Sequence, residues 1–337
     1  MENICRIMMQ DLQKHNFSYN IFIFSGFPGF LEKRQLLFIP FSLLFILAVG
    51  ANSVIIHMIR TEHTLQSPMY ILIGTIAVID LVIPMTFAPK MLLGFLFDWN
   101  EISLVGCLVQ MFFVHLTSSF QSTILLVMAL DRYVAICNPL RYNDYINNST
   151  LMKMFVAVVI RNSIFIIIFT VAAGYLTFCM SNVIENCYCD HMSLVSLACE
   201  NTLKNNIMGL VAIIFLTVVD LLFIFFSYIN IFHAVLRTAS GKARQKAIHT
   251  CSTHLIVILM SYLLALCSFL AYRVKNSIST DAHILVNVLY LILPSCFNPV
   301  IYGVRTKEIR ELILQKIKGG KMSSISTIAQ EVTTEKK

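Results

Sequence analysis

The sequence predicts an all-α membrane protein, built as a bundle of seven transmembrane helices with a short amphipathic helix at the inner surface. Of its 337 residues, 57% are hydrophobic and 13% are charged, whereas soluble domains carry about 25% charged residues. The hydrophobic residues gather into segments of about 20 residues or more, the length that crosses a bilayer. There are seven such segments: residues 36–59, 69–89, 104–130, 154–180, 207–232, 249–272 and 282–304.

These segments divide the chain into three parts. Residues 36–304 form the transmembrane domain, whose loops are too short to hold a separate soluble domain. Residues 1–35 are expected to be a loose extracellular tail, glycosylated at Asn16 in the sequon Asn16-Phe17-Ser18. No apolar segment precedes Leu36, so we expect the first span to act as the signal anchor. Residues 305–337 are expected to form the cytoplasmic amphipathic helix and a disordered tail.

The distribution of Lys and Arg predicts the orientation in the membrane. Basic residues are concentrated in the loops after the first, third and fifth spans and in the C-terminal tail. The loop after the fifth span carries Lys242, Arg244 and Lys246 without an acid. Since basic loops stay in the cytoplasm, we expect a multi-pass plasma-membrane protein with an extracellular N-terminus and a cytoplasmic C-terminus. The net charge of +7 then lies beside anionic lipid, and it does not indicate nucleic-acid binding.

Several spans hold residues that are unusual at membrane depth. Asn52 and Asp80 lie within the first and second spans, and Arg161 lies within the fourth. Such residues are costly to bury and often functional; the alternative is that they only hydrogen-bond neighbouring helices. Arg161 must face the bundle or the inner interface. Pro84 and Pro89 should kink the outer half of the second span.

Cysteines are concentrated in the loop between the fourth and fifth spans. Cys179, Cys189 and Cys199 follow one another at intervals of ten residues, on the side expected to be oxidising, where disulfides form. A zinc site at Cys187, Cys189 and His191 is the alternative, although this spacing is poor for tetrahedral zinc. We therefore expect disulfides to brace this end of the bundle.

The C-terminal part of the bundle should contain a break and a surface helix. The last span holds Pro294 and Asn298-Pro299, so we expect it to be broken or bent near its inner end. Residues 306–317 have helical periodicity and basic flanks, which predicts an amphipathic helix on the inner surface. Its apolar stripe consists of Ile309, Leu312, Ile313 and Ile317.

Six short motifs occur in order along the chain, each at a defined place in a span. They are Pro68–Tyr70, Pro89–Leu92, Met128–Tyr142, Ser227-Tyr228, Lys246–His254 and Asn298–Tyr302. On these motifs, from about residue 24 to residue 310, the chain resembles a rhodopsin-like seven-helix receptor and, within that group, an odorant receptor. Phe27–Glu32 and Gly303–Arg310 resemble the fish-like group, whose members tend to sense water-soluble odorants.

The resemblance implies further features. It implies two disulfides, Cys107–Cys189 and Cys179–Cys199, which leave Cys187 unpaired. It implies coupling to a heterotrimeric stimulatory G protein and a membrane environment, with no cofactor. The family usually has Glu where this chain has Gln121. Asp80 is the candidate sodium ligand, and the neutral Gln121 removes one of the two charges that would hold the ion.

The ligand is expected to bind in the outer half of the bundle. Arg273, at the outer end of the sixth span, could clamp a carboxylate through two hydrogen bonds; the alternative is that it extends to the interface. His115 could bind the ligand or a neighbouring helix. The hypothesis is a small amphiphilic or carboxylic odorant. The candidate polar residues are His115, Ser118, Ser119 and Arg273, and the candidate apolar residues are Met208, Ala212 and Phe269.

The inner half is expected to hold the switch. In the resting state Arg132 pairs with Asp131, and ligand binding favours a second packing in which the sixth span moves outward and frees Arg132. A helix of the G protein would then enter the cleft. The candidate switch residues are Asp131, Arg132, Tyr133, Tyr228, Lys246, His254, Asn298 and Tyr302.

Other classes of function fit the sequence less well. A transporter or channel would usually show internal repeats, and an intramembrane enzyme would need a nucleophile–base pair or a metal motif, so we expect no enzyme. The seventh span has no Lys for a retinal Schiff base. The outer half of the third span has no acid to pair with an amine. The runner-up is a non-olfactory rhodopsin-like chemoreceptor for a small metabolite.

Overall fold

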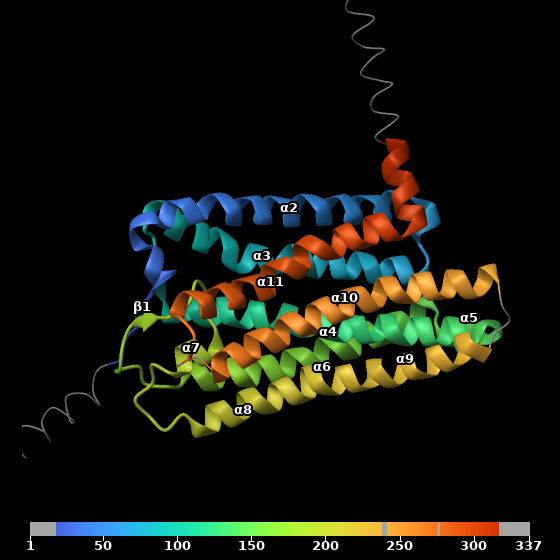
Figure 1. The fold of residues 1–337 in the computed structure, drawn as a ribbon. Helices are drawn as coiled ribbons and strands as arrows, with labels where there is room; N and C mark the ends of the chain where they lie inside the picture. The colour runs from blue at the N-terminus through green and yellow to red at the C-terminus, as the bar shows by residue number, and fades with distance from the viewer. Residues whose placement is uncertain (1–17, 238–240, 275–276, 317–337) are drawn as a thin grey trace, which may run out of the picture.

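Seven long helices dominate the structure, a computed structural model that describes residues 18–237, 241–274 and 277–316 (Figure 1). Asn16, the side chain of Lys246 and the C-terminal tail from residue 317 lie outside the described parts. The seven are long and apolar enough to cross a membrane, which confirms the predicted fold class. They are α2 (Arg34–Thr61), α3 (Pro68–Phe97), α4 (Leu104–Cys137), α6 (Asn148–Gly174), the α8–α9 pair (Leu203–Ile213 and Val219–Arg237), α10 (Lys242–Arg273) and α11 (Thr280–Arg305).

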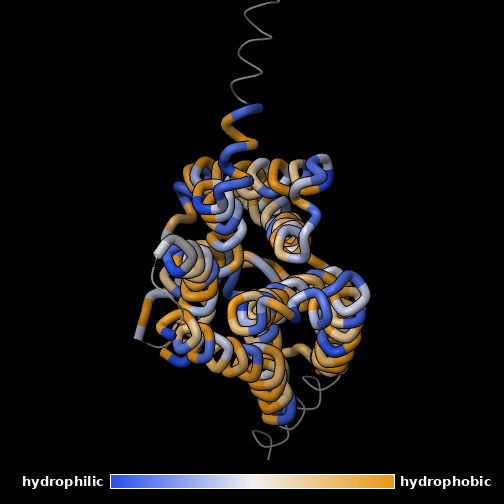
Figure 2. Tube along the Cα trace, turned by 90° about the vertical axis from the view of Figure 1, so that its right-hand side faces the viewer, coloured by the Kyte–Doolittle hydropathy of each residue, from blue (hydrophilic) through white to orange (hydrophobic). Residues whose placement is uncertain are grey.

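Three of these helices form the centre of the bundle. In α3, α4 and α11, between 56% and 61% of the membrane-spanning stretch is buried, compared with 22% to 28% in the other four spans. The less buried helices turn apolar faces outward, and Figure 2, which looks along the bundle, shows hydrophobic residues on its outside. Lipid is as apolar as the core, so such helices need no polar outer face.

Two spans can be compared with the expectation in detail. The helix α11 was expected to be broken or bent, and it is continuous through Pro294 and Pro299, without a break. The fourth span ends at Gly174 instead of Met180, because the following apolar residues belong to the loop. Leu176 and Phe178 pack in a core at the disulfide end of the bundle, and Phe178 pairs with Ala198.

The fifth span is interrupted. Between α8 and α9 lies a π-helical turn, η4 (Ile214–Val218), which the sequence analysis did not predict. A π-helical turn adds a residue to the helix, so the residues on either side of it face different directions than they would in a regular helix. This turn orients Asp220, which follows it, towards α4 and α6.

A small sheet covers one end of the bundle. Strand β1 (Ile21–Phe24) lies between β2 (Glu101–Ser103), to which it is antiparallel, and β3 (Val183–Ile184), to which it is parallel. Phe22 and Phe24 are buried in it, so the expectation of a loose tail over residues 1–35 is wrong for this segment. The disulfides Cys107–Cys189 and Cys179–Cys199 lie at the same end, which we call the disulfide end.

The other end contains Arg132 and the last helix, and we call it the Arg132 end. Residues 307–316 are helical, and Ile309 is fully buried against the bundle core with Leu312 and Ile313 beside it. Lys316 forms an ion pair of 3.0 Å with Glu62 of the first loop. The predicted amphipathic helix is therefore present, and its apolar stripe packs on the bundle.

Candidate functional site

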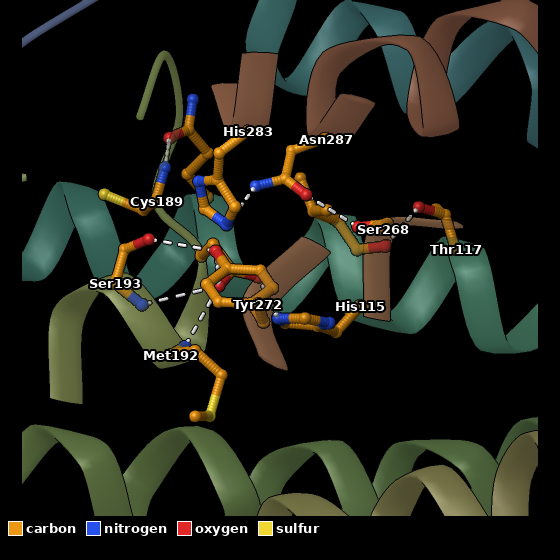
Figure 3. Close-up of polar contacts among 12 residues, drawn as sticks. His115, Thr117, Cys189, Met192, Ser193, Ser268, Tyr272, His283 and Asn287 are labelled. Carbon is orange, nitrogen blue, oxygen red and sulfur yellow. Dashed lines mark hydrogen bonds and ion pairs between the residues drawn. The ribbon is translucent and has the colours of Figure 1, made fainter. Parts of the chain in front are cut away.

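A cluster of polar side chains lies under the loop at the disulfide end (Figure 3). Asp190 of this loop precedes the short helix α7 (His191–Val195), and its Oδ2 accepts hydrogen bonds from the backbone N–H groups of Met192 and Ser193. The Tyr272 hydroxyl of α10 donates to the same oxygen over 2.5 Å and lies 3.0 Å from the Ser193 hydroxyl. We call Asp190, Tyr272, Ser193 and His115 the Asp190 cluster.

This cluster continues into α11. The Tyr272 ring meets the ring of His283 edge to face, with centroids 4.4 Å apart. His283 Nε2 lies 3.4 Å from the amide of Asn287, whose oxygen accepts a hydrogen bond of 2.7 Å from Ser268 of α10. His283 and Asn287 are fully buried. Polar contacts therefore connect the loop, α10 and α11.

His115 of α4 completes the cluster from the opposite side. Its Nε2 lies 3.8 Å from Asp190 Oδ1. This nitrogen is shielded from solvent and has no hydrogen-bond partner within the described parts of the chain. The imidazole meets Phe169 of α6 edge to face, at a centroid distance of 5.2 Å. Within those same parts, His115 is the only basic side chain within 4 Å of the Asp190 carboxylate.

A second histidine lies beside the cluster without carrying charge. The ring of His191 stacks on Phe169 with centroids 3.9 Å apart. Burial and, as a smaller cause, the neighbouring His115 lower the pKa of His191, Asp190 opposes both, and the resulting pKa is about 4. His191 is therefore neutral near pH 7 and supplies an apolar face rather than a cation.

The other predicted ligand residues do not gather around one point. Arg273 is exposed at the end of α10, with its guanidinium 5.1 Å above the Phe269 ring, so it does not join the Asp190 cluster. Ala212 of α8 packs in an apolar cluster with Phe169 of α6. Met208 is only half-buried.

The two serines of α4 have partners of their own. The Ser118 side chain hydrogen-bonds Tyr290 of α11. The Ser119 hydroxyl donates to the Leu116 carbonyl within its own helix.

The sequence analysis missed the acid at the centre of this cluster. Asp190 was overlooked because it lies in a loop, where an acid is common. One signal was available: Asp190 directly follows Cys189, and the disulfide attaches Cys189 to Cys107 on α4. Cys107 lies about 12 Å from His115 along the helix, so an acid anchored there can reach the histidine.

At the Arg132 end, the charged residues of α4 form a compact group. Arg132 pairs with Asp131 at 3.0 Å, and the Tyr142 hydroxyl donates to the other Asp131 oxygen at 2.7 Å. Burial and the hydrogen bond to Asp131 raise the pKa of Tyr142, which therefore remains a donor. Tyr133 packs in a small apolar cluster with Ile231 and other residues of α9 and α10.

Further contacts hold α10 at the same end. The Tyr228 hydroxyl of α9 lies 2.7 Å from His254 Nδ1 of α10. Arg305 of α11 donates to Thr253 and Ser252 of α10 at 3.0 and 2.8 Å. Arg305 was not among the predicted switch residues.

Tyr302 is buried between helices rather than directed at Arg132. It lies on α11, and its hydroxyl contacts the sulfur of Met128 on α4 at 3.9 Å. These contacts join α4, α9, α10 and α11 at the Arg132 end.

Asp80 is held by amides at the centre of the bundle. Its Oδ1 accepts from Gln121 at 2.7 Å and its Oδ2 from Asn298 at 2.8 Å. Asn52 bonds the carbonyl of Ser295 at 2.7 Å instead. Two donors on a single carboxylate do not make the oxygen-rich cage that a cation needs. In this arrangement the Asp80 carboxylate is hydrogen-bonded by amides on both oxygens.

Arg161 and Asp220 form a second buried polar group. Their ion pair is 2.8 Å long, and Asp220 is 1% exposed. Asp220 also accepts from Thr123 at 2.9 Å, and Arg161 donates to the Phe215 carbonyl within the π-helical turn. The pair joins α6 to α9 and supplies a partner for a backbone group of the turn.

Known proteins resemble this chain in sequence and in fold. A sequence profile described as "Olfactory receptor" matches residues 41–319. The chain is 41% identical to human olfactory receptor 52K1 over 294 residues, which is 87% of this chain and 94% of that protein. It is 39% identical to rat olfactory receptor 51E2 over 303 residues, 90% of this chain and 95% of the relative. Squid rhodopsin superposes with a TM-score of 0.66 at 17% identity, covering 85% of each chain.

Proposed function

This chain belongs to the olfactory receptor family of G-protein-coupled receptors, and on that premise we propose that a small, water-soluble odorant binds at the Asp190 cluster and activates a stimulatory G protein at the Arg132 end. It is a multi-pass plasma-membrane receptor and not an enzyme. In our proposal the disulfide end, with the N-terminal strand, faces outward, Asn16 is glycosylated, and the Arg132 end faces the cytoplasm.

The observation that carries the proposal is that α10 has polar contacts at both of its ends. At the disulfide end, Tyr272 bonds Asp190. At the Arg132 end, His254 contacts Tyr228, and Ser252 accepts from Arg305. A helix held at two distant points can respond at one end to a change of contacts at the other.

The ligand acts by changing the balance between two arrangements of α10. In the closed arrangement Arg132 stays paired with Asp131. An odorant that contacts the Asp190 cluster more favourably when the Arg132 end of α10 is open shifts the population to the open state. The shift is limited by the difference between its affinities for the two states.

The basic residues at the start of α10 favour an acidic partner. Arg244 and Lys246 lie in this part of the helix, and complementary charge mainly raises the rate of association. A G-protein helix that enters beside Arg132 would break the contacts of Arg305 with α10.

A cyclic-AMP reporter assay tests the proposal. Cells that express the receptor are exposed to small alcohols, amines, amino acids and carboxylic acids, while surface expression is measured with an antibody. We expect a concentration-dependent rise in cyclic AMP for at least one class, and its loss in Arg132→Ala at equal surface expression. Silence across the panel from a receptor that is present at the surface would contradict the proposal.

A further inference from the structure

An open hollow lies between α3 and α4 at the disulfide end of the bundle, and it shares no residue with the Asp190 cluster. Its volume is about 460 Å³, and strand β2 contributes to its wall. Gln110 of α4 is buried at its floor, where it donates to the Thr86 carbonyl of α3 at 3.1 Å and accepts from the backbone N–H of Cys189 at 2.8 Å. These bonds join the two helices and the loop beneath the hollow, so its shape is set by the fold.

Two opposite charges line this hollow without forming an ion pair. They are Lys90 of α3 and Glu101 of β2. Within the described parts of the chain, neither has an oppositely charged side chain within 4 Å. The Lys90 ammonium lies 5.1 Å from the centroid of the Trp99 ring, a cation–π contact that holds it at the rim. Separate charges of both signs in one hollow favour a ligand that also carries both.

The beginning of α4 adds a second positive element. Ser103 is the N-cap of this helix, and its hydroxyl oxygen accepts a hydrogen bond of 3.1 Å from the Gly106 N–H. Both residues line the hollow. The first turn of a helix carries a partial positive charge and attracts phosphate groups. Together with Lys90, this turn suits an anionic group, while Glu101 suits a cationic one.

The hollow lies at the boundary between the apolar part of the bundle and its polar end. Lys90 is about 10 Å along α3 from the last residue of that helix, Phe97. Trp99, just beyond, is 62% exposed, and tryptophan and long basic side chains gather at the membrane interface. Val109 and Phe113 also line the hollow, and both are exposed and apolar. A ligand in this place meets the headgroup layer and the hydrocarbon layer together.

We propose that this hollow binds the headgroup of a zwitterionic phospholipid from the surrounding bilayer, with its phosphate at Lys90 and the first turn of α4 and its ammonium group at Glu101. The acyl chains then run along Val109 and Phe113. A phospholipid that has the phosphate but no ammonium group leaves Glu101 facing a like charge, so the site prefers the zwitterionic lipid. The inference goes beyond the proposed function, since neither an odorant nor a G protein takes part, and it gives the lysine of the motif Pro89–Leu92 a role.

Trp99 makes the test direct, because it is the only tryptophan in the chain. Phospholipids with brominated acyl chains quench tryptophan fluorescence on contact. The purified receptor in detergent micelles is titrated with brominated phosphatidylcholine and, separately, with brominated phosphatidylglycerol, which has no ammonium group. The variants are Lys90→Gln and Glu101→Gln. The matched controls are Lys153→Gln, an exposed lysine on α6, and Glu200→Gln, an exposed acid at the disulfide end.

We expect the natural receptor to be half-quenched by phosphatidylcholine at a concentration about two- to fivefold below that of phosphatidylglycerol, the range of an exposed ion pair. Glu101→Gln should remove this difference, because the ammonium group loses its partner. Lys90→Gln should raise the half-quenching concentration of both lipids about three- to tenfold, because both phosphates lose a charged donor. Both controls should match the natural receptor.

Equal half-quenching concentrations for the two lipids on the natural receptor, or a lower value for phosphatidylglycerol, would overturn the proposal. Values that stay unchanged in both Lys90→Gln and Glu101→Gln would do the same, since they would show that lipid reaches Trp99 only by partition into the micelle. Glu101 is exposed, so its variant keeps the test available should Lys90→Gln fail to fold. The measurement contains no odorant and no G protein, so its failure leaves the proposed function intact.

Discussion

Among single residues, Gln121 has a clear consequence for the bundle centre. Its amide donates to one oxygen of Asp80, and Asn298 donates to the other. The family that the sequence resembles usually has Glu at the position of Gln121. One carboxylate with two amide donors is a hydrogen-bonded group, whereas two carboxylates would repel each other unless a cation lay between them. A single substitution should therefore convert one arrangement into the other.

Gln121→Glu is expected to make the receptor sensitive to sodium. The second carboxylate lies beside Asp80, so sodium should bind the folded state and stabilise it by about 1.4 kcal/mol at ten times its dissociation constant. Thermal unfolding of the detergent-solubilised protein in sodium chloride and in choline chloride measures this difference. The natural receptor should unfold at the same temperature in both salts; an equal sodium shift in the two proteins would contradict the argument.

His191 should make stability depend on pH. Its pKa is lowered to about 4 in the folded protein, against about 6.5 in an unfolded chain. Between these values the unfolded chain binds a proton that the folded receptor excludes, so the free energy of unfolding falls as the pH drops below about 6.5. The full loss approaches about 3 kcal/mol near pH 4.

The matched variant for this pH effect is His191→Phe, which keeps an aromatic ring on Phe169. Melting temperatures measured between about pH 7.5 and 5 should fall less steeply for this variant than for the natural receptor. Parallel curves would show that His191 does not carry the dependence.

At the level of elements, the fifth span is divided by its π-helical turn. In the turn η4 (Ile214–Val218), the Phe215 carbonyl accepts a hydrogen bond from the Arg161 guanidinium. The same guanidinium forms an ion pair with Asp220 of α9. A side chain from α6 thus supports an irregular backbone, which inside a membrane requires a partner for each polar group. The ion pair and the turn should depend on each other.

Removing one member of this pair should cost more than removing both. Arg161→Met leaves Asp220 buried and unpaired, which costs about 3–5 kcal/mol. Arg161→Met combined with Asp220→Leu should recover part of this loss, because no charge remains uncompensated. Thermal unfolding of the single and double variants measures the coupling; purely additive losses would mean that the two residues act independently.

For the whole molecule, α10 is the element that connects the two ends. Tyr272 attaches it to Asp190 of the loop, and Arg305 attaches it to α11 near Arg132. Neither contact is local in sequence. In the proposed mechanism, an odorant replaces the contact at Asp190 and a G protein replaces the contacts of Arg305.

Arg305→Gln is expected to raise basal signalling. Losing two hydrogen bonds from a charged donor removes about 1.5–3 kcal/mol from the closed arrangement for each bond, enough to shift a two-state equilibrium at least about tenfold. Cyclic AMP without odorant, normalised to surface expression, measures this shift. The control is Lys307→Gln, an exposed residue that pairs with Glu311 one turn away; lower basal signal in Arg305→Gln than in this control would contradict the closed-state role.

Part of this architecture follows from local properties of the chain. Span length and hydrophobicity determine the seven helices, since about 20 apolar residues suffice to cross a bilayer wherever they occur. The motif Met128–Tyr142 and its five companions carried the resemblance to the family, and the family profile matches residues 41–319. The helical stripe of Ile309 predicted a surface helix for the same reason: periodicity is a property of a few neighbouring residues.

What only the tertiary structure decided concerns direction and distance. From the sequence, Arg273 and Asp190 are both expected at the same end of the bundle. In the structure Arg273 is exposed, whereas Asp190 is buried beside His115. Strand β1 is buried because two distant segments pair with it, and α9 turns Asp220 inward through a π-helical turn. By itself the sequence determined which segments enter the membrane and to which family they belong. Which charge lies beside His115 depends on how a loop crosses the bundle, and non-local packing sets that path.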